Sequence, residues 1–177
     1  WGYSDLTTVL NAIYAKTGQT GVLYQIRNVL YKERKQQMTD VRDVLCEGCD
    51  ALYRIDYHYV QGTEMHGIIV GGNIRCFLKL SGTAYMPDLN GKILLLESRS
   101  GTVARMETYL SQLQQIGAFE QIAGILLGTF TEMEAKQCMP DIVQLVKKYV
   151  RKTMPIAVTK QIGHGTDAKG IVIGGEL

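Results

Sequence analysis

Three polar residues, far apart in the chain, are of the types that nucleophilic catalysis requires. Ser4 stands at the entry of a predicted helix, Glu97 closes the apolar run 93–96, and His164 lies between two glycines. A serine hydroxyl becomes a nucleophile when an imidazole takes its proton, and a carboxylate orients that imidazole. Geometry and not chain order defines such a triad, so the order serine, glutamate, histidine is compatible with it. Spacing alone does not show that the three side chains meet.

Each of the three residues also has a simpler structural interpretation. A serine before an amphipathic helix is most often an N-cap, and a carboxylate at the end of a buried strand usually marks where that strand meets solvent. The flanking glycines predict that His164 lies in a loop with little side-chain cover. A catalytic serine needs a strand before its turn, and we expect that strand to precede Trp1. His58 and His66 are interpreted as a strand-face histidine and a loop histidine.

Periodic patterns predict the elements that would position these residues. Apolar residues at helical spacing predict a helix over residues 5–17, which Gly18 ends. Residues 39–45 are predicted to form a short helix, and the alternation of tyrosines with polar residues predicts a half-buried strand over 52–60. Residues 19–37, between these two predicted helices, are polar and basic. Their charge indicates a solvated face or loop, and the basic residues are Lys32, Arg34 and Lys35.

A glycine-rich stretch in the middle of the chain is a further candidate for chemistry. The apolar residues 67–70 run into Gly71-Gly72-Asn73, which we interpret as a tight turn with Asn73 as the N-cap of a following helix. Strands and helices alternate from there on, so the predicted class is α/β. The predicted elements are a strand at 92–97, a helix at 103–116 ended by Gly117, a strand at 122–130, a helix at 142–150, and strands at 156–158 and 170–173.

Composition and charge exclude several classes of protein. The chain has 177 residues, of which 46% are apolar and 20% charged, a size that suits one domain or a little more. A net charge of +2 is too small to indicate a nucleic-acid or membrane partner, and every apolar run is far shorter than the roughly 20 residues of a membrane helix. Gly71-Gly72 forms neither a dinucleotide-binding nor a P-loop motif, which disfavours a nucleotide-binding module, and we expect no cofactor.

The four cysteines indicate neither a disulfide scaffold nor a metal site. Cys46 and Cys49 form a C-x-x-C pair, but no second pair and no histidine pair accompanies it at zinc spacing. We therefore expect reduced cysteines, no bound metal and a cytosolic protein. The remaining two cysteines are Cys76 and Cys138.

A series of short motifs, none of them decisive alone, runs in a specific order along the chain. The motifs are Gly2-Tyr3-Ser4-Asp5-Leu6-Thr7 with Asn11-Ala12-Ile13-Tyr14, Gly71-Gly72-Asn73, Gly82-Thr83-Ala84-Tyr85, Gly91-Lys92-Ile93-Leu94-Leu95-Leu96-Glu97, Gln112-Leu113 with Gly117-Ala118-Phe119, Gly124-Ile125-Leu126-Leu127-Gly128, and Ile162-Gly163-His164-Gly165. By this combination the chain resembles the C-terminal portion of an LD-carboxypeptidase, a member of serine peptidase family S66. Residues 19–64 match that family poorly.

The resemblance implies a role for each candidate site residue. Ser4 would be the nucleophile, Glu97 the orienting acid and His164 the general base. The backbone N–H of Asp5 would form half of an oxyanion hole, whose other half the family takes from a glycine-rich segment upstream of the nucleophile. Gly72 and Asn73 are hypothesised to lie near anionic groups of the substrate, with a tight turn and an N-cap as the equal alternative.

The resemblance also implies a division of the chain. Residues 1–49 would be the remnant of an N-terminal Rossmann-like domain, with the nucleophile turn and its helix, and residues 50–177 the C-terminal β/α domain. The chain begins in mid-pattern at Trp1, so we expect the N-terminal part of a longer protein to be absent. Family members typically form homodimers, and a homodimer is expected here.

The implied reaction is hydrolysis of the bond from an L-centre to a D-residue, which releases terminal D-alanine from a murein tetrapeptide during cytoplasmic cell-wall recycling. A second branch of the family cleaves peptidyl or aminoacyl nucleotides and confers resistance to microcins, with an aromatic lid residue stacked on the base. The only tryptophan, Trp1, stands beside the nucleophile and not on a lid, so the murein substrate is favoured over the nucleotide.

A third possibility is a non-catalytic fragment, because loss of one oxyanion donor costs about 10²- to 10³-fold in rate.

Overall fold

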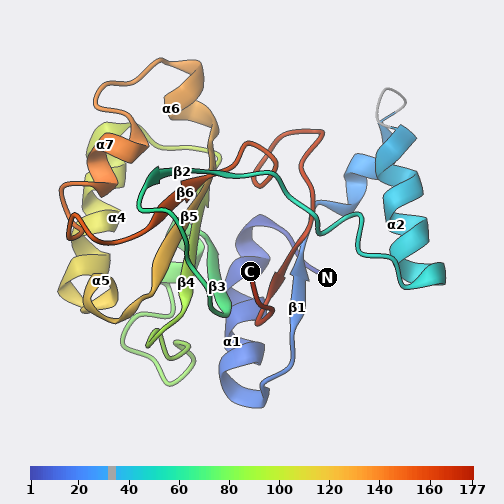
Figure 1. Cartoon of the computed structure of the whole chain (residues 1–177), viewed down its shortest axis with the longest axis horizontal. Coiled ribbons are helices and arrows are strands. Elements are labelled where there is room, and N and C mark those ends of the chain that lie inside the picture. Colours follow the sequence, from blue (N-terminus) through green and yellow to red (C-terminus); the bar gives the residue numbers. More distant parts are fainter. Residues whose placement is uncertain (32–34) are drawn as a thin grey trace.

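The computed structural model describes residues 1–31 and 35–177, so Lys32 and Arg34, predicted to be solvated, lie outside the described residues. A five-stranded sheet of order β2-β6-β5-β4-β3 forms the centre, and a separate antiparallel pair joins β1 to β7 (Figure 1). The strands β3 to β6 are mutually parallel, and β2 is antiparallel at the edge. The strands are β1 Gly21–Leu23, β2 His58–Gln61, β3 Ile69–Asn73, β4 Ile93–Ser98, β5 Gly124–Phe130, β6 Ile156–Val158 and β7 Ile171–Ile173.

Side chains of β4 and β5 alternate between two hydrophobic cores, one on each face of the sheet. Leu94 and Leu96 belong to one core, and Ile93 and Leu95 belong to the other. Figure 1 shows α4, α5 and α7 on one side of the sheet and α1 with β1 on the other. Because both faces are covered, the central strands read as continuous apolar runs, as is typical of parallel sheets. The α/β class is confirmed.

The predicted helices are present, with changes in their bounds. Gly18 and Gly117 both adopt left-handed backbone at the ends of their helices, with φ of 71° each, because glycine carries no Cβ to oppose that conformation. Several short elements, among them β1, α5 and α6, were not predicted because none is long enough to show a period. The helices are α1 Thr7–Thr17, α2 Lys35–Glu47, α3 Ile74–Leu78, α4 Val103–Gln115, α5 Ala118–Gln121, α6 Thr131–Ala135 and α7 Ile142–Val146.

The strand predicted over residues 52–60 is wrong for most of its length. Only His58–Gln61 pairs, as β2 against β6. The carbonyl of Asp50 accepts hydrogen bonds from the N–H groups of Tyr53 and Arg54, at 2.8 and 3.2 Å, so the chain turns there. Leu52 is buried in a small third core with Tyr24 of the segment after β1 and with Val41 of α2. This long-range packing overrides the local alternation of tyrosines.

The predicted tight turn at Gly71-Gly72 is also wrong, because both glycines lie inside β3. Gly71 pairs with Leu95 and Gly72 with Leu96 of β4, at φ of 103° and 129°. A Cβ on Gly72 would lie 2.8 Å from the Thr7 hydroxyl oxygen, so the missing side chain lets α1 approach the strand. The predicted N-cap is confirmed, since the Asn73 side chain accepts from the N–H of Cys76 at 3.3 Å.

No helix in the described ranges is long and apolar enough to cross a membrane. The division of the chain at residues 49 and 50 stays a prediction. Within the described residues α1 packs directly on β1 and β3, and Leu10 of α1 shares a core with Ile69 of β3 and Leu95 of β4.

Replacing Gly71 by alanine tests the close approach of β3 and β4. The new Cβ would collide with the carbonyl oxygen of Leu95 and would stand at a backbone conformation that L-residues rarely adopt. We expect Gly71→Ala to lower the free energy of unfolding by about 2–4 kcal/mol, measured by urea denaturation. Gly18→Ala is the matched control, because it also has positive φ but nothing lies within 4 Å of its Cβ. Equal losses in the two variants would contradict this packing argument.

Candidate active site

Ser4 lies on a sharp turn between an extended segment and a helix. The N–H of Gly2 donates to Val22 at 2.9 Å, and the carbonyl of Gly2 accepts from Tyr24 at 2.8 Å, so this segment pairs in parallel with the β1 segment. The expectation that a strand precedes Trp1 stays a prediction, and within this chain an isolated bridge forms at Gly2. Ser4 then takes φ of 52° and starts a 3₁₀ turn, Ser4–Leu6, that leads into α1. An extended segment, a strained residue and a helix in this order resemble a nucleophile elbow.

The alternative interpretation of Ser4 as an N-cap is wrong. The cap residues are Tyr3 for the 3₁₀ turn and Leu6 for α1, and neither makes a side-chain cap hydrogen bond. A positive φ is uncommon for a residue with a Cβ and costs free energy of order 1–3 kcal/mol. Such strain at Ser4 points its hydroxyl away from the helix backbone and toward the cavity described below.

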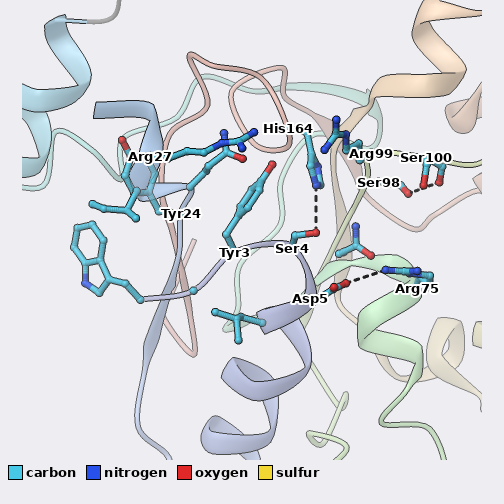
Figure 2. A pocket seen from close by; sticks show the side chains of 16 residues that line it. Tyr3, Ser4, Asp5, Tyr24, Arg27, Arg75, Ser98, Arg99, Ser100 and His164 are labelled. Carbon is cyan, nitrogen blue, oxygen red and sulfur yellow. Dashed lines mark hydrogen bonds and ion pairs between the residues drawn. The ribbon is translucent and has the colours of Figure 1, made fainter. Parts of the chain in front are cut away.

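His164 joins Ser4 to Glu97 in one chain of contacts. Its Nδ1 lies 2.7 Å from Oε2 of Glu97, and its Nε2 lies 3.4 Å from the Ser4 hydroxyl oxygen (Figure 2). A carboxylate on the Nδ1 side places the ring proton there and leaves Nε2 free to accept the serine proton. The structure thus brings together the three residues that the sequence singled out.

The predicted lack of side-chain cover over His164 is wrong. Only 6% of the His164 side chain and 3% of the Glu97 side chain are exposed. The ring of Tyr3 packs over the imidazole, with 4.8 Å between ring centroids. The flanking Gly163 has φ of 138° and packs directly on Thr129, so the glycines here serve close packing and not exposure.

Glu97 receives a second donor from the neighbouring strand. Asn73 at the end of β3 is in register with Glu97 of β4, and its Nδ2 donates to Oε1 at 3.1 Å. Both carboxylate oxygens therefore have a partner, as a buried carboxylate requires. Asn73 lines the cavity beside Ser4, whereas Gly72 is buried against Thr7 and Leu23. A role of Gly72 and Asn73 in substrate binding stays a prediction.

The Asp5 side chain anchors the nucleophile turn to α3. Its Oδ1 accepts from Arg75 at 2.8 Å and from the thiol of Cys76 at 3.0 Å. The hydrogen bond from Cys76, together with the Arg75 charge, lowers the pKa of the Asp5 carboxyl. Leu6, which donates to Tyr3 at 3.0 Å, makes the first hydrogen bond within the turn, so the N–H of Asp5 precedes it and is available to a ligand. The oxyanion role of Asp5 stays a prediction.

A cavity of about 490 Å³ opens over Ser4 and His164 (Figure 2). Its lining combines an aromatic side, two aliphatic residues and three arginines. The half-buried Tyr3 hydroxyl donates to the carbonyl of Gly163 at 3.5 Å, and partial burial, reinforced by the charge of Glu97, raises the pKa of Tyr3 so that it stays a neutral phenol. Trp1, which the sequence placed beside Ser4, is part of this lining; the side chains that the sequence did not single out are Tyr3, Tyr24, Arg27, Arg75 and Arg99.

Of these overlooked residues, Tyr3 had a usable signal in the sequence. It directly precedes Ser4, so proximity alone could have suggested it. Arg27 stands in a segment without periodicity, and Arg99 follows the end of β4, so their approach to the cavity depends on the fold.

Within the described residues, no group of three histidine, cysteine, aspartate or glutamate side chains is placed to hold a metal ion. Cys46 and Cys49 are free thiols on the surface, at and just beyond the end of α2, and Cys76 is buried. The chemistry that Ser4, His164 and Glu97 together can support is nucleophilic attack by a serine hydroxyl, assisted by an imidazole and a carboxylate.

A mostly parallel α/β sheet thus places Glu97 at the end of β4, where His164 and the strained Ser4 meet it in one chain of contacts. Residues 66–177 match the family described as the LD-carboxypeptidase C-terminal domain. The chain belongs to this family of peptidase S66 carboxypeptidases, which confirms the resemblance noted in the sequence.

Individual relatives agree with this assignment. The chain is 29% identical to a putative carboxypeptidase of Treponema pallidum over 99% of its length and 59% of that protein. It is 26% identical to a probable murein peptide carboxypeptidase of Bacillus subtilis, over 98% of this chain and 57% of that protein. The chain thus spans about three fifths of the length of these relatives.

Solved structures share the fold. The structure of MccF in complex with glutamyl sulfamoyl guanosine superposes with a TM-score of 0.81 at 17% identity, over 99% of this chain and 62% of that one. The muramoyltetrapeptide carboxypeptidase of Oxalobacter formigenes superposes with a TM-score of 0.79 at 18% identity, again over 99% and 62%.

Thiol labelling tests the contact between Cys76 and the nucleophile turn. Burial and the hydrogen bond to Asp5 raise the pKa of the Cys76 thiol, so little reactive thiolate forms near neutral pH. We expect iodoacetamide at pH 8 to modify the exposed Cys46 and Cys49 at least about tenfold faster than Cys76, as measured by peptide mass spectrometry. In urea the three rates should converge. A native Cys76 that reacts as fast as Cys46 would rule out the buried contact.

Proposed function

We propose that this chain carries the catalytic triad of a serine-type LD-carboxypeptidase, with Ser4 as nucleophile, His164 as general base and Glu97 as the orienting acid. The observation that carries the proposal is the continuous contact from Glu97 through His164 to Ser4. The substrate is a murein tetrapeptide, from which the enzyme removes the terminal D-alanine.

The geometry defines a sequence of proton movements. Nε2 of His164 takes the proton of Ser4 as its oxygen attacks the carbonyl of the scissile bond, and Glu97 stabilises the imidazolium that forms. The N–H of Asp5 donates to the developing oxyanion. His164 then gives the proton to the departing amine of D-alanine, and water, activated by the same imidazole, hydrolyses the acyl-enzyme.

The murein substrate is supported by the relatives and by the character of the site. Two of the reported relatives are named for murein peptide or muramoyltetrapeptide carboxypeptidase activity. The cavity combines hydrophobic lining with several cations, which suits a short peptide that ends in a carboxylate. A cytoplasmic location and a homodimer remain part of the proposal.

A second candidate function is hydrolysis of aminoacyl nucleotides, as in the MccF branch. Trp1 lines the cavity and packs edge-on against Tyr24, with 5.8 Å between ring centroids. An aromatic pair of this kind offers a stacking surface to a base. Trp1 stands on the nucleophile side of the cavity, and the three arginines favour the peptide acid.

Labelling by a fluorophosphonate tests the triad directly. The probe needs only an activated serine, so we expect it to modify Ser4 of the 177-residue chain. His164→Ala and Glu97→Gln should slow the labelling by about 10²-fold or more, because both remove the activation of the hydroxyl. Ser100→Ala is the matched control, since Ser100 lines the same cavity outside the triad and should leave the rate unchanged. Labelling that survives His164→Ala would overturn the triad.

A direct comparison of substrates separates the two functions. We expect release of D-alanine from a murein tetrapeptide to exceed cleavage of an aminoacyl-sulfamoyl nucleotide, with products measured by mass spectrometry. Because the proposal assigns one oxyanion donor, the N–H of Asp5, we expect turnover by the 177-residue chain to be about 10²- to 10³-fold slower than at a two-donor site. Preferential cleavage of the nucleotide would favour the MccF-like function. Robust release of D-alanine would contradict the expected impairment.

A further inference from the structure

The cavity over Ser4 carries an excess of positive charge. Its lining includes three arginines, Arg27, Arg75 and Arg99, and among the described lining residues Asp5 is the one carboxylate. Arg75 is paired with Asp5 at 2.8 Å, so this pair is already neutralised. Arg27 and Arg99 are left as two exposed cations, and the mechanism above uses neither.

Both of these arginines stand on restrained backbone beside His164. Arg27 lies in the 3₁₀ turn Ile26–Leu30, and the adjacent Asn28 donates from Nδ2 to the carbonyl of Gly165 at 3.3 Å, which ties this turn to the histidine loop. Arg99 follows β4, two residues after Glu97, and its carbonyl accepts from the N–H of Glu132 at 3.1 Å. Figure 2 shows the two side chains reaching toward His164 from opposite sides.

The shared cavity lining places both charges near the reacting atoms. Arg27, Arg99 and His164 all line it, with one arginine on each side of the imidazole. The ring of Tyr3 packs on the same imidazole, and both arginines act to lower the pKa of its phenol, against the larger effect of burial. The two guanidinium groups therefore flank the space next to His164, where the departing amine would receive its proton.

We propose that Arg27 and Arg99 form a subsite for the terminal carboxylate of the residue that leaves, an assignment that rests on the proposed function. Guanidinium groups bind carboxylates through charge-assisted and often paired hydrogen bonds. With the carboxylate held between them, the amine of the leaving residue lies close to Nε2 of His164. The pair then selects peptides with a free carboxyl end and rejects internal bonds, for which no carboxylate is present.

Binding of a peptide acid and of its amide tests the subsite. The probe is a short peptide that ends in D-alanine, prepared as free acid and as carboxamide, with Ser4→Ala as the background to prevent turnover. Trp1 is the only tryptophan and lines the cavity, so its fluorescence reports on occupancy. We expect the acid to bind at least about tenfold more tightly than the amide.

Arginine variants assign this preference to particular residues. Arg27→Ala and Arg99→Ala should each weaken binding of the acid about five- to tenfold and leave binding of the amide unchanged, and replacement by lysine should restore part of the loss. Arg151→Ala is the control, because Arg151 is exposed and lies outside the cavity lining. Circular dichroism checks that each variant is folded.

The outcomes separate this proposal from the proposed function. Equal affinity for acid and amide, no binding of either peptide, or equal losses in both arginine variants and in Arg151→Ala would overturn the subsite. If Ser4 resists the fluorophosphonate while the arginine variants lose their preference for the acid, the subsite stands and the hydrolase function fails. If Ser4 is labelled but the preference is absent, the hydrolase function stands without the subsite.

Discussion

The buried carboxylate of Glu97 is the constraint on which the rest of the site depends. An ionised carboxylate with 3% of its side chain exposed is costly unless its oxygens accept hydrogen bonds. One donor, Asn73, comes from the neighbouring strand, and the other, His164, comes from a loop 67 residues further along the chain. The carboxylate thereby orients the imidazole toward Ser4, and a change in the register of β3 against β4 would remove one of its partners.

The sheet brings Asn73 and Glu97 together at the carboxyl ends of its parallel strands. Asn73 and Glu97 stand at the carboxyl ends of the parallel strands β3 and β4 and pair in register. In open α/β sheets the space beyond the carboxyl ends of the strands is where ligands bind. The nucleophile turn, Ser4–Leu6, leads into α1 and lies near these strand ends. Gly72 permits this close approach because it leaves room for Thr7. A glycine buried behind the site therefore controls how closely the nucleophile is held.

Charge in the cavity is arranged in two layers with different roles. Beneath the surface, Glu97 and the neutral phenol of Tyr3 surround the imidazole. Around the opening lie the arginines, one of which fixes Asp5 and hence the turn that bears the nucleophile. In the proposed function, proton transfer would take place in a covered environment, and anionic parts of a substrate would meet the cations at the entrance. This separation fits a family whose members are carboxypeptidases.

The sequence by itself determined the α/β class, the ends of the helices at Gly18 and Gly117, and the three residue types of the candidate triad. These features are local, because periodicity and glycine conformation depend on neighbours within a few residues. The fold alone decided that Gly71 and Gly72 extend β3, that the chain turns at residues 50–54, and that Tyr3 covers His164. It also brought Arg27 and Arg99 to the same cavity. Such contacts arise from strand register and from packing between distant segments, which no local pattern encodes.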